Sequence, residues 1–258
     1  MTSLKSIAVD WPTQPQNVAV LSTTRIGGFS RSPYDDGSGQ GGLNLGDHVA
    51  DDAEAVQRNR ERLREQCPSE PVWLKQVHGN EVVNAAKVDG VPEADASFTT
   101  QAGVVCAILT ADCMPVLFCD QSGSVVAAAH AGWRGLASGV LENTVAAMRA
   151  AGAKDLMAWM GPAIGPQKFE VGSDVVQAFT HLGAVAESAF MPLAERPGKF
   201  LANLPQLVRC ILNKQDVTQL FGCADCTVSD AQRFYSFRRD GVTGRMASLI
   251  WIRRSSIG

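Results

Sequence analysis

Histidine is scarce in this chain, and its scarcity limits the chemistry available to the protein. Only four histidines occur among 258 residues, namely His48, His78, His130 and His181. A multicopper oxidase needs two imidazoles at its blue-copper centre and many more at its trinuclear cluster. The count therefore excludes a conventional multicopper oxidase and leaves room for a centre with a single metal ion.

The chain also lacks an excess of basic charge and a long uninterrupted apolar run. Its formal net charge is -3, so no general basic field is present to bind nucleic acid. The longest apolar stretch, Gly103–Cys119, contains Thr110, Asp112 and Pro115, unlike a transmembrane helix. The first residues show no basic segment followed by an apolar core. We expect a cytoplasmic protein that binds neither nucleic acid nor membranes; its oligomeric state stays open.

Cysteine is present in an odd number, seven, which argues against a framework of disulfides. Two of the cysteines, Cys223 and Cys226, have the CxxC spacing. A redox CxxC usually opens a helix, whereas this one leads into Thr227 and Val228. A place in the core or in a pocket wall is the favoured interpretation of this pair.

What is present is ordinary globular composition, with 45% hydrophobic and 19% charged residues. We therefore expect one domain over residues 1–258.

Apolar runs predict strands at Val18–Thr24, Val72–Val77, Glu81–Ala86, Ala94–Thr99, Val104–Leu109, Met114–Cys119, Ser124–Ala129, Leu156–Met160 and Ala247–Ile252. Caps and periodicity predict helices at Ala53–Gln66 (capped by Asp51), Leu136–Ala151, Ser173–Leu182 and Leu204–Lys214. Ser30–Gly42 is expected to be a loop, and Phe234–Gly241 a strand that leads into a turn. The irregular mixture favours an α+β class or an α/β/α sandwich with mixed β-sheets.

Three side chains that can bind metals stand where the predicted strands stop. These are His78, Cys113 and His130. Two imidazoles and one thiolate suit zinc, and three protein ligands leave a fourth position for water or substrate. Their spacing matches no short zinc-finger motif, and each residue alone is more often structural. From the residues alone, a metal site and a structural role are about equally supported.

Longer strings resemble the YfiH-type laccase-domain family, first described as multicopper polyphenol oxidases and now as purine nucleoside phosphorylases. The strings are Lys75–Gly79 (KQVHG), Thr110–Val116 (TADCMPV) and Ala129–Gly135 (AHAGWRG), and the likeness runs from about residue 18 to 252. The resemblance implies a three-layer α/β/α sandwich with mixed β-sheets, similar to a fold described for cysteine hydrolases. It also implies that His78, Cys113 and His130 bind Zn²⁺, with Cu²⁺ possible at the same ligands.

The family implies phosphorolysis of adenosine, inosine and methylthioadenosine to the free base and ribose 1-phosphate. It also implies adenosine deaminase activity, an older polyphenol oxidase activity, and for some relatives the removal of faulty cell-wall precursors. The expected partners are therefore a purine nucleoside and phosphate.

The implied reactions need further groups. Zinc that activates water suits deamination, and Asp112 is the candidate for general acid/base catalysis, with a role beside a ligand histidine as the equal alternative. Arg25, Arg238 and Arg245 are candidates for holding phosphate, because the guanidinium fork matches its oxygens. The family strings add Asn44 as a substrate-binding candidate. For Arg134 a salt bridge at a helix start is favoured over catalysis.

Three kinds of protein remain open at this point. The first is the zinc-dependent phosphorylase and deaminase, with a copper-dependent oxidase as an alternative use of the same ligands. The second is a cysteine hydrolase acting on cell-wall precursors, in which Cys113 is both a metal-site candidate and the catalytic nucleophile, with His130 or His78 as its base. The third is a binding protein without catalytic activity.

Overall fold

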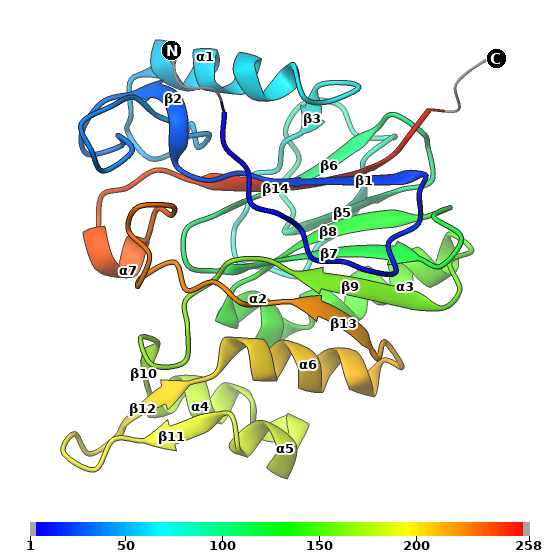
Figure 1. Cartoon of the computed structure of the whole chain (residues 1–258). Helices are drawn as coiled ribbons and strands as arrows, with labels where there is room; N and C mark the ends of the chain where they lie inside the picture. The colour runs from blue at the N-terminus through cyan, green and yellow to red at the C-terminus, as the bar shows by residue number, and fades with distance from the viewer. Residues whose placement is uncertain (1–3, 255–258) are drawn as a thin grey trace.

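The computed structural model describes residues 4–254, apart from the side chain of residue 185, and places helices on both sides of a pair of stacked sheets (Figure 1). The strands are β1 (Val18–Ser22), β2 (Ile26–Ser30), β3 (Pro71–Val72), β4 (Val82–Asn84), β5 (Ala96–Thr99), β6 (Val105–Thr110), β7 (Met114–Asp120), β8 (Val126–Ala131), β9 (Leu156–Met160), β10 (Glu170–Gly172), β11 (Phe190–Pro192), β12 (Lys199–Ala202), β13 (Gln219–Gly222) and β14 (Met246–Ile252). The helices are α1 (Ala53–Arg64), α2 (Trp133–Ser138), α3 (Val140–Ala150), α4 (Ser173–Ala178), the 3₁₀-helix η1 (Thr180–Leu182), α5 (Ala184–Glu187), α6 (Leu204–Lys214) and α7 (Phe237–Asp240). Over the described residues, none of these helices combines the length and the apolar character needed to cross a membrane.

Two mixed sheets form the centre of the molecule. The first has the order β1-β14-β6-β3, in which only the β3–β6 pair is parallel. The second has the order β13-β9-β7-β8-β5-β4, with parallel pairs at its two edges and antiparallel pairs between them. The expected class with mixed sheets and helices is therefore confirmed.

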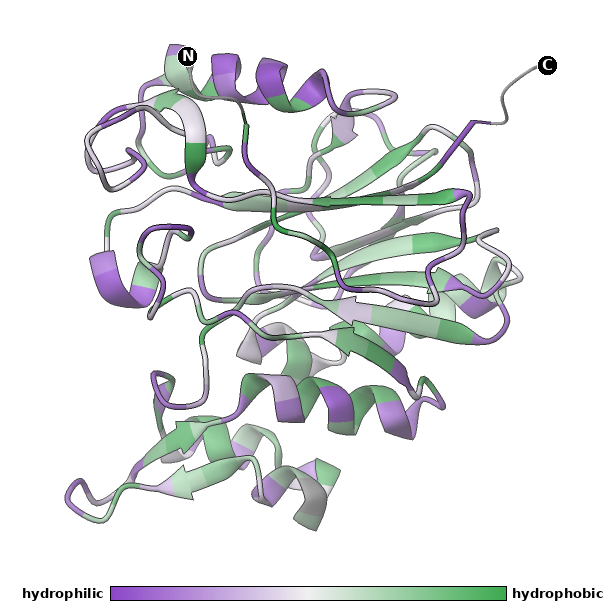
Figure 2. Cartoon of the chain, in the orientation of Figure 1, coloured by the Kyte–Doolittle hydropathy of each residue, from purple (hydrophilic) through white to green (hydrophobic). Residues whose placement is uncertain are grey.

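The central strands are buried because each sheet is covered on both faces. Every residue of β6, β7 and β8 is buried, as their largely apolar sequences predict. Between the sheets, Ile108 and Ile250 of the first pack in one apolar cluster with Leu117 of the second. Helix α1 covers the outer face of the first sheet, and α3 and α6 cover that of the second (Figure 1). Hydropathy follows this layering, with apolar strands inside and polar residues on the outer surfaces of the helices (Figure 2).

A smaller unit of short elements lies beyond α6 and was largely missed by sequence patterns. It contains the sheet β10-β12-β11 and the segments α4, η1 and α5. Its strands are only three or four residues long, too short to show a clear alternation. The single helix expected at Ser173–Leu182 is wrong, because its second half tightens into η1 with a bond from Leu182 N to Phe179 O.

Two helix boundaries differ from expectation for identifiable reasons. Helix α1 is capped by Asp52, which accepts from Ala55 N, while the Asp51 carboxylate accepts from Asn44 instead. The helix expected at Leu136–Ala151 is split into α2 and α3 at Gly139. The φ of this residue is 95°, in the left-handed region that glycine adopts without a steric penalty.

The strand expected at Val72–Val77 ends after Val72, because a side chain replaces the backbone as the partner of β6. Gln76 Nε2 donates to Leu109 O at 2.8 Å, and Gln76 Oε1 accepts from Leu109 N at 2.8 Å. The segment Phe234–Gly241 likewise contains no strand. Ser236 caps α7 by accepting from Arg239 N, so the chain turns into a short helix there.

Candidate metal centre and cavity

Three side chains that can bind metals converge from three different segments. His78 follows β3, Cys113 lies in the tight turn between β6 and β7, and His130 is on β8. One ligand atom from each lies within 4.8 Å of the others. Cys113 Sγ is 3.9 Å from His78 Nε2, and the two imidazole rings meet edge to face. We call these three residues the metal cluster.

A buried carboxylate, Asp95, organises two members of the metal cluster. Its Oδ1 accepts from His130 Nδ1 at 2.7 Å and from His78 N at 3.0 Å. Its Oδ2 accepts from Val77 N and Gly79 N. Because a carboxylate can only accept, the His130 proton stays on Nδ1 and the Nε2 lone pair is left for a metal. The three backbone bonds also hold His78 at its left-handed φ of 61°.

Glycine in the AHAGWRG string permits the close approach of the cluster. A Cβ atom on Gly132 would lie 2.9 Å from Cys113 Sγ and 3.1 Å from His78 Cδ2. The first separation is shorter than real Cβ contacts and the second is tight, so a side chain here would push the Cys113 thiol and the His78 ring out of place. The string therefore serves the site in two ways, by supplying His130 and by keeping space beside it.

The cluster favours the ionised thiol and the protonated imidazole in the metal-free protein. Burial alone would raise the pKa of Cys113, but the charges and hydrogen bonds of His130 and His78 outweigh it and lower that pKa to about 6. Burial would lower the pKa of His130, yet the Cys113 thiolate and Asp95 raise it to about 9. Burial by itself would raise the pKa of Asp95, but its hydrogen bonds with His130 and with Gly79 N outweigh this effect and lower that pKa.

The donor set fits a tetrahedral metal ion with one open position. Bond lengths of about 2.3 Å to sulfur and about 2.0 Å to nitrogen place two ligand atoms roughly 3.6 Å apart. The Sγ–Nε2 separation of 3.9 Å is close to that value. A thiolate with two imidazoles suits zinc and also copper, and three protein ligands leave a fourth position toward the cavity.

The metal cluster lies in a cavity of about 480 Å³ that also holds three arginines. Arg134 is on α2, Arg238 is on α7, and Arg245 directly precedes β14. We call these three residues the arginine wall. Arg134 stacks on Trp133 and makes no hydrogen bond or ion pair with any described residue, so the expected salt bridge is wrong. Burial lowers the pKa of Arg245, which is the effect of placing a cation away from water.

Arg25 and Asn44, two predicted substrate-binding residues, do not line the cavity. The Arg25 guanidinium is buried and donates to Asp35 O and Ala231 O, so it ties loops together. Asn44 accepts from Gly46 N and Arg245 N, and its amide donates to Gly46 O and Asp51. Asn44 therefore positions the backbone of Arg245, and its own polar atoms are used inside the protein.

Asp112 lines the cavity beside the cluster, but both its oxygens have partners in the protein. Oδ1 accepts from Thr227 Oγ1 at 2.6 Å, and Oδ2 accepts from Arg238 N at 2.6 Å. The carboxylate that contacts a ligand histidine is Asp95, which sequence reasoning missed. An aspartate between two alanines at the start of a buried strand was the available signal.

Two further residues, His48 and Cys226, lie in or next to the cavity. His48 lines the cavity, where burial and the charge of Arg245 lower its pKa. Cys226 does not line the cavity; its Sγ accepts from Gly165 N at 3.2 Å, next to the lining residue Ile164. The aromatic lining residues Trp133, Phe169 and Phe237 were not identified from sequence.

Comparisons with known proteins identify the family to which the chain belongs. Residues 19–253 match the family described as multi-copper polyphenol oxidoreductase laccase. A purine nucleoside phosphorylase of Pseudomonas aeruginosa is 52% identical over 244 residues, covering 95% of this chain and 97% of that protein. The purine nucleoside phosphorylase YfiH of Escherichia coli is 49% identical over 254 residues, covering 96% and 99%. A crystal structure of a Neisseria meningitidis protein superposes with a TM-score of 0.89 at 48% identity, covering 98% of this chain and 100% of that one. The chain therefore belongs to the YfiH-type laccase-domain family.

Proposed function

We propose that the protein is a zinc-dependent purine nucleoside phosphorylase that converts adenosine, inosine and methylthioadenosine to the free base and ribose 1-phosphate. The observation that carries the proposal is the presence of a two-histidine, one-cysteine cluster and three arginines in one cavity. The names of the similar Pseudomonas aeruginosa and Escherichia coli proteins support the same reaction.

The reaction requires a bond change that this cavity can assist. A phosphate oxygen bonds to C1′ of the ribose as the bond from C1′ to the base nitrogen breaks, and that nitrogen takes the electron pair and a proton. The arginine wall binds the phosphate dianion, and Arg134 has its guanidinium free to do so. Asp112 is the one carboxylate among the described cavity-lining residues, and we assign proton transfer to it.

His78, Cys113 and His130 would hold the zinc ion, and Asp95 would keep the His130 ring in its ligand tautomer. When bound, zinc supplies Lewis acidity that polarises an oxygen or activates a water molecule. Adenosine deaminase activity at the same cluster belongs to this proposal, because attack of water on the base is helped by such activation.

The test is incubation of metal-quantified protein with adenosine, with and without phosphate. We expect adenine and ribose 1-phosphate only in the presence of phosphate, and inosine with ammonia in either condition. Full zinc loading without release of adenine in either condition would contradict the phosphorylase. The copper-loaded protein, assayed with a phenolic substrate, reports whether polyphenol oxidation depends on the same cluster.

One observation favours a second candidate, a cysteine hydrolase. Cys113, His130 and Asp95 form a nucleophile–base–orienter series, in which His130 Nδ1 donates to Asp95 at 2.7 Å and the pKa of Cys113 is lowered to about 6. Metal content separates the two candidates. A metal-free enzyme that turns over a cell-wall amide and is inactivated by alkylation of Cys113 would establish the hydrolase.

A further inference from the structure

Phe237 is an apolar side chain kept exposed at the catalytic cavity. It is 59% exposed. The large exposed apolar side chains of the described residues are Val77, Val91, Met191, Phe237 and Val242, and among them only Phe237 lines the cavity. Because this exposed ring lines the cavity, its apolar surface is available for contact with a ligand bound there.

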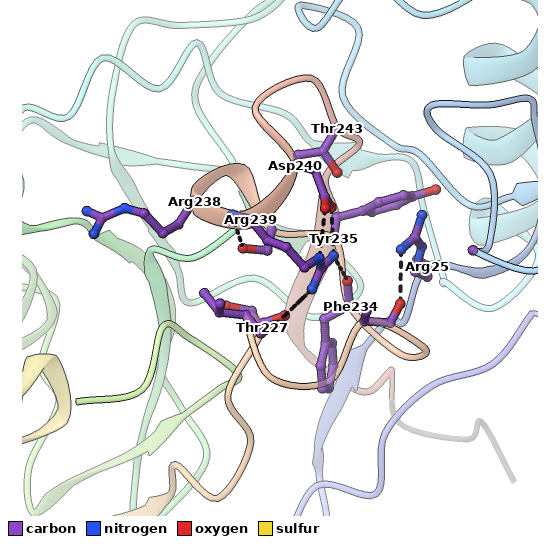
Figure 3. A network of polar contacts seen from close by, with 12 residues as sticks. Arg25, Thr227, Phe234, Tyr235, Arg238, Arg239, Asp240 and Thr243 are labelled. Atoms are coloured by element: carbon purple, nitrogen blue, oxygen red, sulfur yellow. Dashed lines mark hydrogen bonds and ion pairs between the residues drawn. The ribbon is translucent and has the colours of Figure 1, made fainter. Parts of the chain in front are cut away.

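The backbone that carries Phe237 is firmly anchored. The three preceding residues, Phe234–Ser236, are fully buried. Arg239 donates to Thr227 O and Phe234 O and pairs with Asp240, as Figure 3 shows. Arg238 N donates to Asp112 Oδ2, which ties α7 to the turn that carries Cys113. The ring is therefore held at the cavity by a preorganised turn, which lowers the entropic cost of binding against it.

The other two aromatic rings of the cavity each have a face covered by a guanidinium. Arg134 lies over Trp133 at 4.5 Å, and Arg238 lies over Phe169 at 5.5 Å. Among the described residues, no ring or guanidinium is stacked on Phe237. Of the three lining rings Trp133, Phe169 and Phe237, only that of Phe237 has no stacked partner among the described residues.

We propose that Phe237 is the platform on which the planar base of the nucleoside stacks. The inference rests on the proposed function, and it adds the residue that recognises the base. A nucleoside has a flat base with an apolar face, which can stack on the Phe237 ring. Its polar ribose would then lie toward the arginines and the metal cluster. A two-ring purine covers more of the ring than a one-ring pyrimidine, so stacking favours purines.

The experiment compares Phe237→Ala, Phe237→Trp and the matched control Val242→Ala. Val242 is 57% exposed on the turn that follows α7 and does not line the cavity. Calorimetry without phosphate gives the Kd for inosine, which the proposed deamination cannot consume, and steady-state assays give KM for adenosine and for phosphate. We expect Phe237→Ala to weaken inosine binding and to raise KM for adenosine about tenfold, while KM for phosphate and the thermal midpoint stay as in the wild type. Phe237→Trp should bind as the wild type does, and so should Val242→Ala.

The possible failures separate the two proposals. Wild-type protein that releases base with phosphate, combined with unchanged inosine binding in Phe237→Ala, would overturn the stacking role alone. Binding of inosine that depends on Phe237, without phosphate-dependent release of base, would overturn the phosphorylase and leave the stacking site. Wild-type protein that neither binds inosine nor cleaves adenosine would overturn both. An equal loss in Val242→Ala would also overturn the stacking role, because that side chain lies outside the cavity lining.

Discussion

The metal cluster and the arginine wall share one cavity, but they are held in different ways. His130 is part of β8, in the middle of the second sheet, and Cys113 joins two fully buried strands. The arginines are on the short helices α2 and α7 and on the loop before β14. Strand hydrogen bonds, tight packing and the Asp95 carboxylate fix the cluster, whereas the wall consists of long side chains that extend from short helices and a loop.

This difference separates two tasks within one site. A metal ion needs ligand atoms fixed within fractions of an ångström, which buried strands provide. A phosphate group can be held by long guanidinium side chains that adjust their rotamers. Changes in the cluster should therefore remove the metal, while changes in the wall should affect substrate binding and leave the metal in place.

The largest effect is expected for Cys113→Ser. Losing the thiolate should weaken zinc binding by more than the roughly 10- to 100-fold that loss of an outer hydrogen-bonding partner costs. Metal analysis after gel filtration measures the zinc content per chain. The matched control is Cys119→Ala, on the buried strand β7, which should keep its zinc. Zinc retained at full occupancy in Cys113→Ser would place the metal elsewhere.

A smaller loss is expected for Asp95→Asn, which preserves shape but removes the negative charge and replaces one of the two acceptor oxygens with an NH2 group that cannot accept. Zinc affinity should fall by about 10- to 100-fold, because the ring tautomer and the His78 backbone lose their charged acceptor. Competition with a chelator measures this affinity. Asp155→Asn, on an exposed turn, is the control and should bind zinc normally. Equal affinities in the two variants would mean that Asp95 does not organise the cluster.

The role of the arginine wall in binding phosphate is tested by comparing the variants Arg134→Met and Arg25→Met. Arg134→Met should raise KM for phosphate by about tenfold with the zinc content unchanged, because one charge-assisted contact is lost. Arg25→Met should leave that KM unchanged and instead lower the free energy of unfolding by about 1–3 kcal/mol, since the Asp35 and Ala231 carbonyls lose the buried cation that donates to them. A raised KM for phosphate in Arg25→Met, with an unchanged KM in Arg134→Met, would show that Arg25 binds substrate and Arg134 does not.

The smallest expected effect is the pH dependence of Cys113 alkylation in the zinc-free protein. The pKa of Cys113 is lowered to about 6, so its thiolate forms as the pH rises through that value, and the stability it adds is lost below it. Alkylation of Cys113 by iodoacetamide, followed by mass spectrometry, should rise with a midpoint near pH 6 and then level off. In His130→Ala the midpoint should move upward. A wild-type midpoint near the ordinary thiol value would contradict the ion pair.

Sequence patterns predicted the parts of the fold that local rules determine. The strand expected at Leu156–Met160 matches β9 residue for residue, and the run Met114–Cys119 lies within β7. Uniform apolar runs leave few alternatives for such segments. The end of the strand before His78 was predicted wrongly, because the Gln76 side chain takes the place of the backbone in pairing with β6.

The sequence pointed to Asp112, Arg238 and Arg245, which line the cavity, but the contacts that build the cavity could not be predicted because they join residues distant in sequence. Asp95 meets His130 across 35 residues, and Asp112 meets Arg238 across 126. Arg25 and Arg245 both stand beside turn-forming glycines in the sequence. Only the fold shows that the first is buried between loops while the second lines the cavity.

The most direct test of the metal cluster is X-ray absorption spectroscopy at the zinc edge of the zinc-loaded protein. The structure leads us to expect one sulfur at about 2.3 Å and two imidazole nitrogens at about 2.0 Å, with one lighter ligand completing the coordination. In Cys113→Ser the sulfur contribution should disappear. A first shell without sulfur in the wild type, or with several sulfurs, would contradict zinc binding by His78, Cys113 and His130.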